Sequence, residues 1–152
     1  MAAAPSDADL IARVVTAAGL ALPLGIERGI RGSSASDRPF VLVAVGAAAV
    51  TAAVGKQAPN AVAGVITGVG FLGAGVVFRG GHGMVKGITT AASVFVVACI
   101  GVVAGSGRLV LAGLVAALVF FTLEIPYIPF LRVLDTRRYQ NRMKDDDPPM
   151  GM

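Results

Sequence analysis

The chain has 152 residues, of which 55% are hydrophobic and 14% are charged, with a mean hydropathy of +0.77. An ordinary soluble domain is about 25% charged, so this composition excludes such a domain and favours a single helical membrane domain. The net charge of +4 comes from basic residues in loops beside apolar segments. That placement favours a membrane-orientation signal over a nucleic-acid partner.

Five continuously apolar segments indicate an all-α, polytopic membrane protein. An outer-membrane β-barrel is excluded because the runs are rich in alanine and do not alternate between apolar and polar residues. Several segments are shorter than the roughly 20 residues of a perpendicular transmembrane helix, so flanking residues or a thinner bilayer must cover the difference. The predicted helices are Leu10–Ile26, Phe40–Val54, Ala61–Phe78, Ile88–Gly105 and Leu109–Leu123.

The first segment has charged residues near both ends. The N-terminus before it is acidic, not basic, so we expect no cleavable signal peptide and a retained first helix. Arg13 lies about one turn inside the segment, and its long side chain is expected to extend to the membrane surface. At the other end, Glu27 could bind a cation or pair with an arginine from another helix. A solvated helix end is the alternative for Glu27, Arg28 and Arg31.

The third segment is dense in glycine. Each glycine costs a water-soluble helix about 1 kcal/mol relative to alanine, but in a bilayer glycines let helix backbones approach closely. The segment is therefore predicted to be a packed transmembrane helix; a re-entrant or broken helix that lines a path is the alternative. The glycines of this predicted packing surface are Gly64, Gly68, Gly70, Gly73 and Gly75.

A basic, glycine-rich loop, RGGHGMVKG, joins the third and fourth segments. Thr89 or Thr90 could cap the fourth helix, whose first amides attract anions. We therefore expect this region to bind a phosphate or an acidic partner group, although a loop that only sets topology is the alternative. The lone histidine has no acid in its loop to orient it, so it is not a catalytic signal. The predicted docking residues are Arg28, Arg31, Arg79, His82, Lys86, Thr89 and Thr90.

The fifth segment runs into Glu124 and then into Pro126 and Pro129, which should end or kink the helix. Glu124 is expected to form a structural ion pair or, with Glu27, to be a candidate metal ligand. We divide the chain into an external segment (residues 1–9), a transmembrane domain (10–131) and a polar cytoplasmic tail (132–152). The tail is too short for a second folded domain.

The distribution of lysine and arginine predicts the orientation. With five spans, ten basic residues fall on one side of the membrane and three on the other. The basic side is cytoplasmic by the positive-inside rule, which places the N-terminus outside and the C-terminus in the cytoplasm. A model with four or six spans would mix the basic loops across both sides. The charge pattern therefore supports an odd number of spans.

Three stretches resemble the MgtC/SapB family of bacterial inner-membrane proteins: GIERGIRG at Gly25–Gly32, GVGFLGAGVVFR at Gly68–Arg79, and VKGITTAASVFVVACIGVVAGSG at Val85–Gly107. The resemblance covers roughly Leu20–Leu123, and FLGAG followed by TTAA at this spacing is its most specific part. It implies a cytoplasmic-membrane protein tied to magnesium limitation and, in pathogens, to survival in host cells. For the family it implies either magnesium transport or regulatory binding to membrane proteins such as ATP synthase.

The chain departs from the family pattern at four places. Phe95 stands where the family often has tryptophan, and Ser36–Pro39 replaces a Gly-Leu-Arg-Thr run. The acidic and basic residues that often precede the glycine-rich helix are replaced by GKQAPNAVAG, and we expect no separate cytoplasmic domain of the kind that some members have. The last two departures remove support for functions that depend on those external polar groups or on a regulatory domain.

The polar residues decide between the functional alternatives. Magnesium sites usually use one or two carboxylates, whereas the predicted mid-membrane polar residues are Thr51, Thr67, Ser93, Cys99 and Thr122. We therefore favour an accessory or regulatory membrane protein that forms homo-oligomers or binds other membrane proteins. The alternative is an oligomeric magnesium transporter. Magnesium is also the one cofactor that the sequence suggests. No nucleophile–base pair, metal-ligand cluster or Walker-type loop points to an enzyme.

Overall fold

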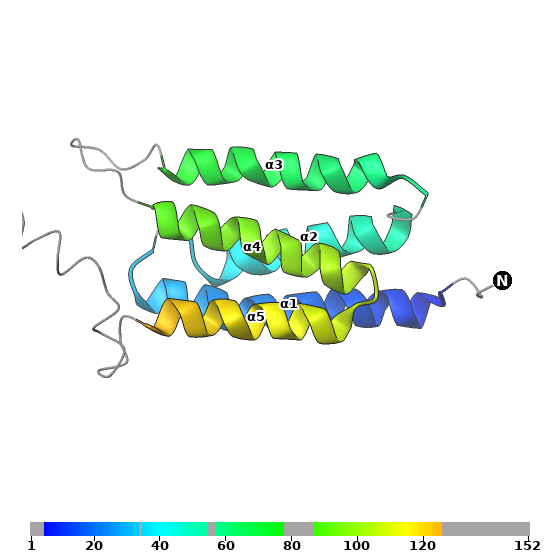
Figure 1. Cartoon of the computed structure of the whole chain (residues 1–152), viewed down its shortest axis with the longest axis horizontal. Coiled ribbons are helices and arrows are strands. Elements are labelled where there is room, and N and C mark those ends of the chain that lie inside the picture. The colour runs from blue at the N-terminus through cyan, green and yellow to red at the C-terminus, as the bar shows by residue number, and fades with distance from the viewer. Residues whose placement is uncertain (1–4, 34, 55–56, 78–86, 126–152) are drawn as a thin grey trace, which may run out of the picture. The chain divides into compact units, whose positions relative to one another are not determined.

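A computed structural model describes residues 5–33, 35–54, 57–77 and 87–125 of the chain. These residues form α1 (Asp7–Ile30), α2 (Asp37–Val54), α3 (Pro59–Val77), α4 (Ile88–Gly105) and α5 (Leu109–Glu124), without a strand in the described ranges (Figure 1). The all-α fold and its five helices are confirmed. The predicted bounds of the fourth helix match those of α4, while α1 is longer at both ends than predicted.

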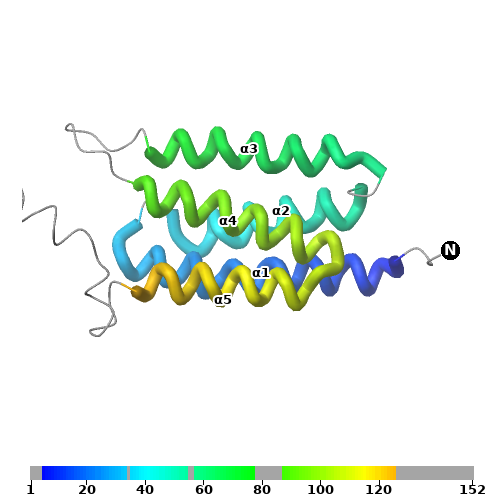
Figure 2. Tube along the Cα trace, viewed as in Figure 1, coloured from blue at the N-terminus to red at the C-terminus, as the bar shows by residue number. Residues whose placement is uncertain are grey.

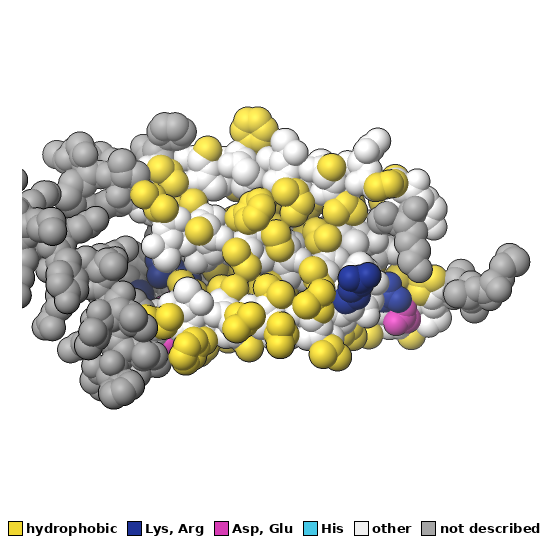
Figure 3. Space-filling view, viewed as in Figure 1, with side chains coloured by type: hydrophobic (Ala, Val, Ile, Leu, Met, Phe, Trp, Pro, Cys, Tyr) yellow, Lys and Arg dark blue, Asp and Glu magenta, His cyan; other side chains and the backbone are white. Residues whose placement is uncertain are grey.

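Four of the described helices, α1 to α4, are long and apolar enough to cross a membrane. The fifth, α5, has 16 residues and would be about 24 Å long, short of the roughly 30 Å hydrocarbon core. On the face shown in Figure 3, hydrophobic and uncharged side chains run along the helices and charged side chains gather near helix ends. This pattern fits membrane-spanning helices, and their orientation stays a prediction.

The chain divides into two compact units, Met1–Val119 and Phe120–Met152. The first contains α1 to α4 and most of α5. The second begins inside α5, and the structure describes it only as far as Ile125. Within that short stretch Phe120 and Phe121 are exposed and Glu124 is half-buried. The predicted boundary of the transmembrane domain at residue 131 lies outside the described residues.

The helix ends follow from local capping chemistry. The Ser6 side chain accepts a hydrogen bond from the Asp9 amide at 3.3 Å, and acidic residues in the first turn suit the positive end of the α1 dipole. Gly87 precedes α4 with φ of +89°, a conformation that strains residues with a side chain. Gly107, with φ of +85°, turns the chain between α4 and α5.

The core of the first unit is centred on α4, which contacts α1, α2 and α3 (Figure 2). Half of the α4 membrane-length window is buried, against 6% for α3. The largest fully buried side chains are Phe40, Leu24, Ile100 and Val97. These come from α1, α2 and α4, so α3 lies against one side of a three-helix core.

Two glycines of α4 allow its close packing against α2. A Cβ added at Gly105 would lie 2.5 Å from the carbonyl oxygen of Ala48, and one added at Gly101 would lie 2.9 Å from Ala47 Cβ. Both approaches are too short for real side chains. The spacing Gly101-x-x-x-Gly105 is a common signal for close helix contact in membranes. The sequence analysis placed close packing only in the third segment and missed this pair.

Candidate functional site

A buried ion pair closes the C-terminal end of α1. Glu27 is only 6% exposed, and its Oε1 accepts a hydrogen bond from Arg31 Nε at 2.6 Å. Arg31 is the C-cap of α1, four residues after Glu27, so the pair is local in the sequence. The predicted partner from another helix is therefore wrong: Glu27 pairs with the arginine that caps its own helix. Its second oxygen, Oε2, is buried and has no hydrogen-bond partner among the described residues.

A second group of contacts ties the same end of α1 to the start of α4. Arg28 Nη2 donates to Thr90 Oγ1 at 3.2 Å, and Ser33 Oγ lies 2.6 Å from the same hydroxyl oxygen. Thr90 is 2% exposed. Its hydroxyl is thus the meeting point of two segments that are far apart in the sequence. We call Glu27, Arg28, Arg31, Ser33 and Thr90 the polar cluster.

The predicted capping role of Thr89 or Thr90 is wrong. The N-cap of α4 is Gly87, which has no side chain, so no side-chain hydrogen bond from the N-cap residue caps this helix. Because the helix begins at Ile88, both threonines lie inside its first turn. Thr89 is exposed, and its carbonyl accepts from Ser93 Oγ at 2.7 Å. Thr90 instead joins the polar cluster.

Of the seven predicted docking residues, the structure therefore gathers Arg28, Arg31 and Thr90 at one end of the bundle and leaves Thr89 outside the cluster. The other three, Arg79, His82 and Lys86, lie outside the described residues. Binding of an anion by this group stays a prediction.

The two candidate metal ligands, Glu27 and Glu124, lie in different units of the chain. Across the described ranges, no group of three or more histidine, cysteine, aspartate or glutamate side chains is arranged to hold a metal ion. Glu27 is held by Arg31, and Glu124 lies in the second unit. Metal binding by either residue stays a prediction.

The glycines of α3 point to more than one side of the helix. At 100° per residue, Gly64, Gly68 and Gly75 share one face, while Gly73 lies on nearly the opposite face. An added Cβ at Gly73 would touch Ala91 Cβ of α4 at 3.7 Å, an ordinary contact. Among the described residues, no heavy atom beyond the local helix comes within 4 Å of a Cβ added at Gly64, Gly68, Gly70 or Gly75.

This result changes the meaning of the predicted packing surface. Among the described residues, the glycines that are closely covered by a neighbouring helix include Gly25 of α1 and Gly101 and Gly105 of α4, but not Gly64, Gly68, Gly70 or Gly75 of α3. Phe71, which shares the face of Gly64 and Gly68, is 77% exposed. We call Gly64, Gly68, Phe71 and Gly75 the glycine face. No described residue outside α3 lies within 4 Å of a Cβ added at the three glycines of this face.

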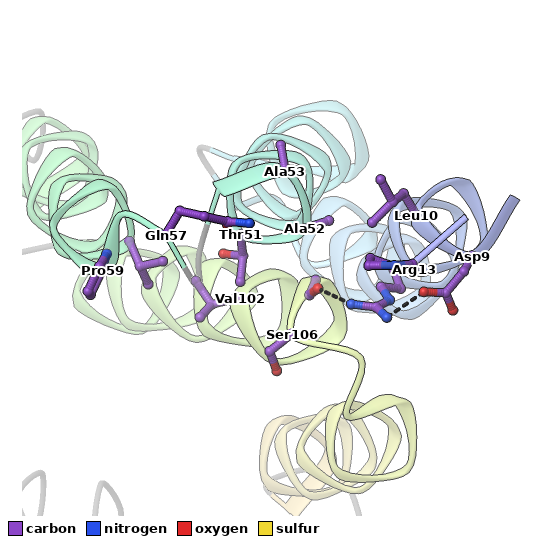
Figure 4. A pocket seen from close by; sticks show the side chains of 13 residues that line it. Asp9, Leu10, Arg13, Thr51, Ala52, Ala53, Gln57, Pro59, Val102 and Ser106 are labelled. Carbon is purple, nitrogen blue, oxygen red and sulfur yellow. Dashed lines mark hydrogen bonds and ion pairs between the residues drawn. The ribbon is translucent and has the colours of Figure 1, made fainter. Parts of the chain in front are cut away.

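At the opposite end of α1, Arg13 contacts the end of α4 as well as its own helix. Its Nη1 donates to the Gly105 carbonyl at the end of α4 at 3.1 Å, and its Nη2 pairs with Asp9 (Figure 4). The side chain is only 17% exposed. Thus Arg13 is held against the neighbouring helix by a carbonyl that has no partner within its own helix. Both partners lie at the end of the bundle where α1 begins, and the extension of Arg13 to the membrane surface stays a prediction.

Comparison with known proteins identifies relatives for most of the chain. A model described as the MgtC family matches residues 14–127. The chain is 34% identical over 131 residues to "Putative magnesium transporter YhiD" of Escherichia coli K12, covering 78% of this chain and 60% of that protein. It is 36% identical over 117 residues to "Protein MgtC" of Brucella abortus, covering 74% and 48%.

"Protein MgtC" of Salmonella typhimurium is 39% identical over 89 residues, covering 56% of this chain and 38% of that protein. The chain thus spans less than two thirds of the length of these relatives. No solved structure matches the chain.

Proposed function

The chain belongs to the MgtC family, and from this premise we propose that it is an accessory protein of the bacterial cytoplasmic membrane. In this proposal it acts under magnesium limitation by binding other membrane proteins. The link to magnesium is supported by the name of one relative, "Putative magnesium transporter YhiD". The proposed contact surface is the glycine face of α3.

The observation that carries the proposal is the difference between the glycines of α3 and those of α4. Gly101 and Gly105, four residues apart, are covered by the backbone of α2. Gly64 and Gly68 have the same spacing, yet no described residue outside their own helix covers them. A glycine that faces lipid offers no side chain for packing. A partner helix with small residues would pack on the glycine face of α3 in the way that α2 packs on Gly101 and Gly105 of α4.

The contacts of Glu27 also support an accessory role over transport. A transported divalent cation needs carboxylate or carbonyl oxygens along its path. Glu27 lies near the end of α1, where Arg31 already holds one of its oxygens at 2.6 Å. A cation at this position would have to compete with a guanidinium that is part of the fold.

The proposal is tested by recovering membrane complexes of the full chain from cells grown at low magnesium. Gly68→Leu fills the glycine face with a large side chain, and we expect it to reduce recovery of partner proteins about tenfold, equivalent to about 1.4 kcal/mol. Gly46→Leu is the matched control, because among the described residues nothing lies within 4 Å of a Cβ added at Gly46 of α2. Equal recovery with the two variants would contradict the proposal.

The recovered material also separates two kinds of partner. Recovered complexes that contain a second protein support the accessory role. Products that contain only two or more copies of this chain would instead assign the glycine face to a homo-oligomer. In that case the accessory role would have to use another surface.

Magnesium transport is the second candidate, favoured by one observation: Glu27 Oε2 is buried and lacks a hydrogen-bond partner within the described residues. Such an oxygen could serve as a cation ligand. Magnesium flux into liposomes that contain the purified chain tests this. Flux that is abolished by Glu27→Gln, with the folded protein retained, would favour transport over the accessory role.

A further inference from the structure

A pocket of about 730 Å³ lies at the end of the bundle where α1 begins and where α2 and α4 end (Figure 4). It belongs to the first unit and is lined by residues of all four long helices. Along α1, Arg13 in this pocket is about 21 Å from Glu27 of the polar cluster. The pocket is therefore distinct from the site described above.

Two buried polar atoms in the lining lack a partner. Thr51 is 8% exposed, and its Oγ1 makes no hydrogen bond to any described residue. Arg13 uses both terminal nitrogens, one on Gly105 and one on Asp9, while its buried Nε has no described acceptor. Both groups can donate, and a buried donor without an acceptor is unfavourable. The pocket is therefore suited to a ligand with oxygen acceptors.

The charged side chains of the pocket, Arg13 and Asp9, indicate which class of ligand it can bind. The Arg13 guanidinium and the Asp9 carboxylate form an ion pair, so together they carry no net charge. The Asp9 side chain is about half-exposed and can still accept from a cation beside it. A phosphate that contacts Arg13 and Thr51 would be balanced by a cationic group next to Asp9. This arrangement fits a zwitterion better than a simple anion.

An apolar groove continues from the pocket along α1 and α2. This groove has a volume of about 310 Å³ and shares Leu10, Ala52 and Ala53 with the pocket. Further along, its lining includes Ile11 and Val15, and both of these side chains are largely exposed. A hydrocarbon chain could lie here while the polar end of the same molecule occupies the pocket.

We propose that the pocket binds a zwitterionic phospholipid whose headgroup carries a primary amine. On binding, the Arg13 and Thr51 side chains, whose Nε and Oγ1 are covered in the structure, turn to donate hydrogen bonds to its phosphate oxygens. Its amine lies beside Asp9, and one acyl chain follows the groove. The ends of membrane-spanning helices are at the depth of lipid headgroups, as this binding requires. The site is independent of the glycine face, so it stands or falls separately from the proposed function.

The test uses the full chain purified in detergent and titrated with phosphatidylethanolamine, with bound lipid counted by native mass spectrometry. Thr51→Val keeps the side-chain shape and removes the hydroxyl. We expect it to weaken lipid retention about tenfold, and to leave the melting temperature of the lipid-free protein unchanged or raise it. Thr16→Val is the matched control, because the exposed Thr16 hydroxyl donates to Ala12 of its own helix. It should leave retention unchanged.

A second variant tests the other half of the headgroup. The wild-type chain should retain phosphatidylethanolamine better than phosphatidylcholine, whose quaternary ammonium cannot donate a hydrogen bond. Asp9→Asn should remove this preference. This measurement stands even if Thr51→Val reduces the yield of folded protein.

Three results would overturn the proposal. The first is equal lipid retention by Thr51→Val and Thr16→Val, which would leave water as the occupant of the pocket. The second is displacement of the lipid by free phosphoethanolamine at equal concentration, which would assign the site to a soluble ligand. The third is equal retention of the two lipids by the wild-type chain.

Discussion

The contact between α2 and α4 gives the sharpest stability prediction. Gly101→Ala adds a Cβ that would lie 2.9 Å from Ala47 Cβ and even closer to the carbonyl oxygen of Ala44. Carbon atoms in contact prefer separations of about 3.5–4.0 Å, so the two helices must move apart by about 1 Å. A backbone carbonyl in a helix cannot rotate away as a flexible side chain can. The strain must therefore be relieved by movement of a whole helix.

The size of the effect follows from two opposing contributions. Overpacking of a well-packed core costs about 1–3 kcal/mol, and the backbone clash favours the upper end of this range. Alanine is better than glycine in a helix by about 1 kcal/mol. We expect Gly101→Ala to lower the free energy of unfolding by about 2 kcal/mol, taking the difference between these contributions.

The measurement is reversible unfolding of the purified chain in mixed detergent micelles. Gly46→Ala is the matched control: it lies on α2, and within the described ranges an added Cβ there meets no atom within 4 Å. It should be neutral or stabilising by up to about 1 kcal/mol. If Gly101→Ala were as stable as Gly46→Ala, close approach of α2 and α4 at this glycine would be refuted.

The remaining predictions concern the polar cluster. Thr90→Val should destabilise the chain by about 1–3 kcal/mol, because Arg28 and Ser33 lose the hydroxyl that joins them, whereas Thr90→Ser should retain most of the stability. Glu27→Ala should cost less than the roughly 3–5 kcal/mol of a fully buried broken ion pair, because Arg31 is partly exposed and can turn towards water. Thermal unfolding measures both, and a neutral Thr90→Val would show that the cluster does not join α1 to α4.

The helices were predictable because continuous apolar runs separated by polar or glycine-containing turns leave few alternatives. The bounds of the fourth helix were predicted correctly, Ile88–Gly105, since Gly87 and the GSG turn interrupt it on both sides. Hydropathy could not show which glycines are covered. The third and fourth segments are both apolar and rich in small residues, and only the three-dimensional arrangement places α4 in the centre and α3 at the side.

Among the polar contacts, the local one could be predicted from the sequence and the long-range ones could not. The pair of Glu27 and Arg31 could have been predicted from its spacing of four residues on a helix. The contact of Arg28 with Thr90 joins residues 62 apart, so no local pattern indicates it. The contact of Arg13 with α4 could not be predicted for a similar reason: the carbonyl that accepts its hydrogen bond belongs to Gly105, at the end of a different helix.

The choice between an accessory role and transport depends on what the Glu27 carboxylate does in the folded chain. Arg31, the C-cap of α1, balances its charge at 2.6 Å, so the pair is local to the end of this helix. A magnesium ion at this position would gain Oε2 as a ligand but would meet the positive field of Arg31. Magnesium also gives up its water reluctantly and is usually held by one or two carboxylates. Among the described residues, no group of three or more histidine, cysteine, aspartate or glutamate side chains is arranged to hold a metal ion, at Glu27 or elsewhere. A stable helix end that supports binding surfaces elsewhere therefore agrees better with these contacts than a conducting site does.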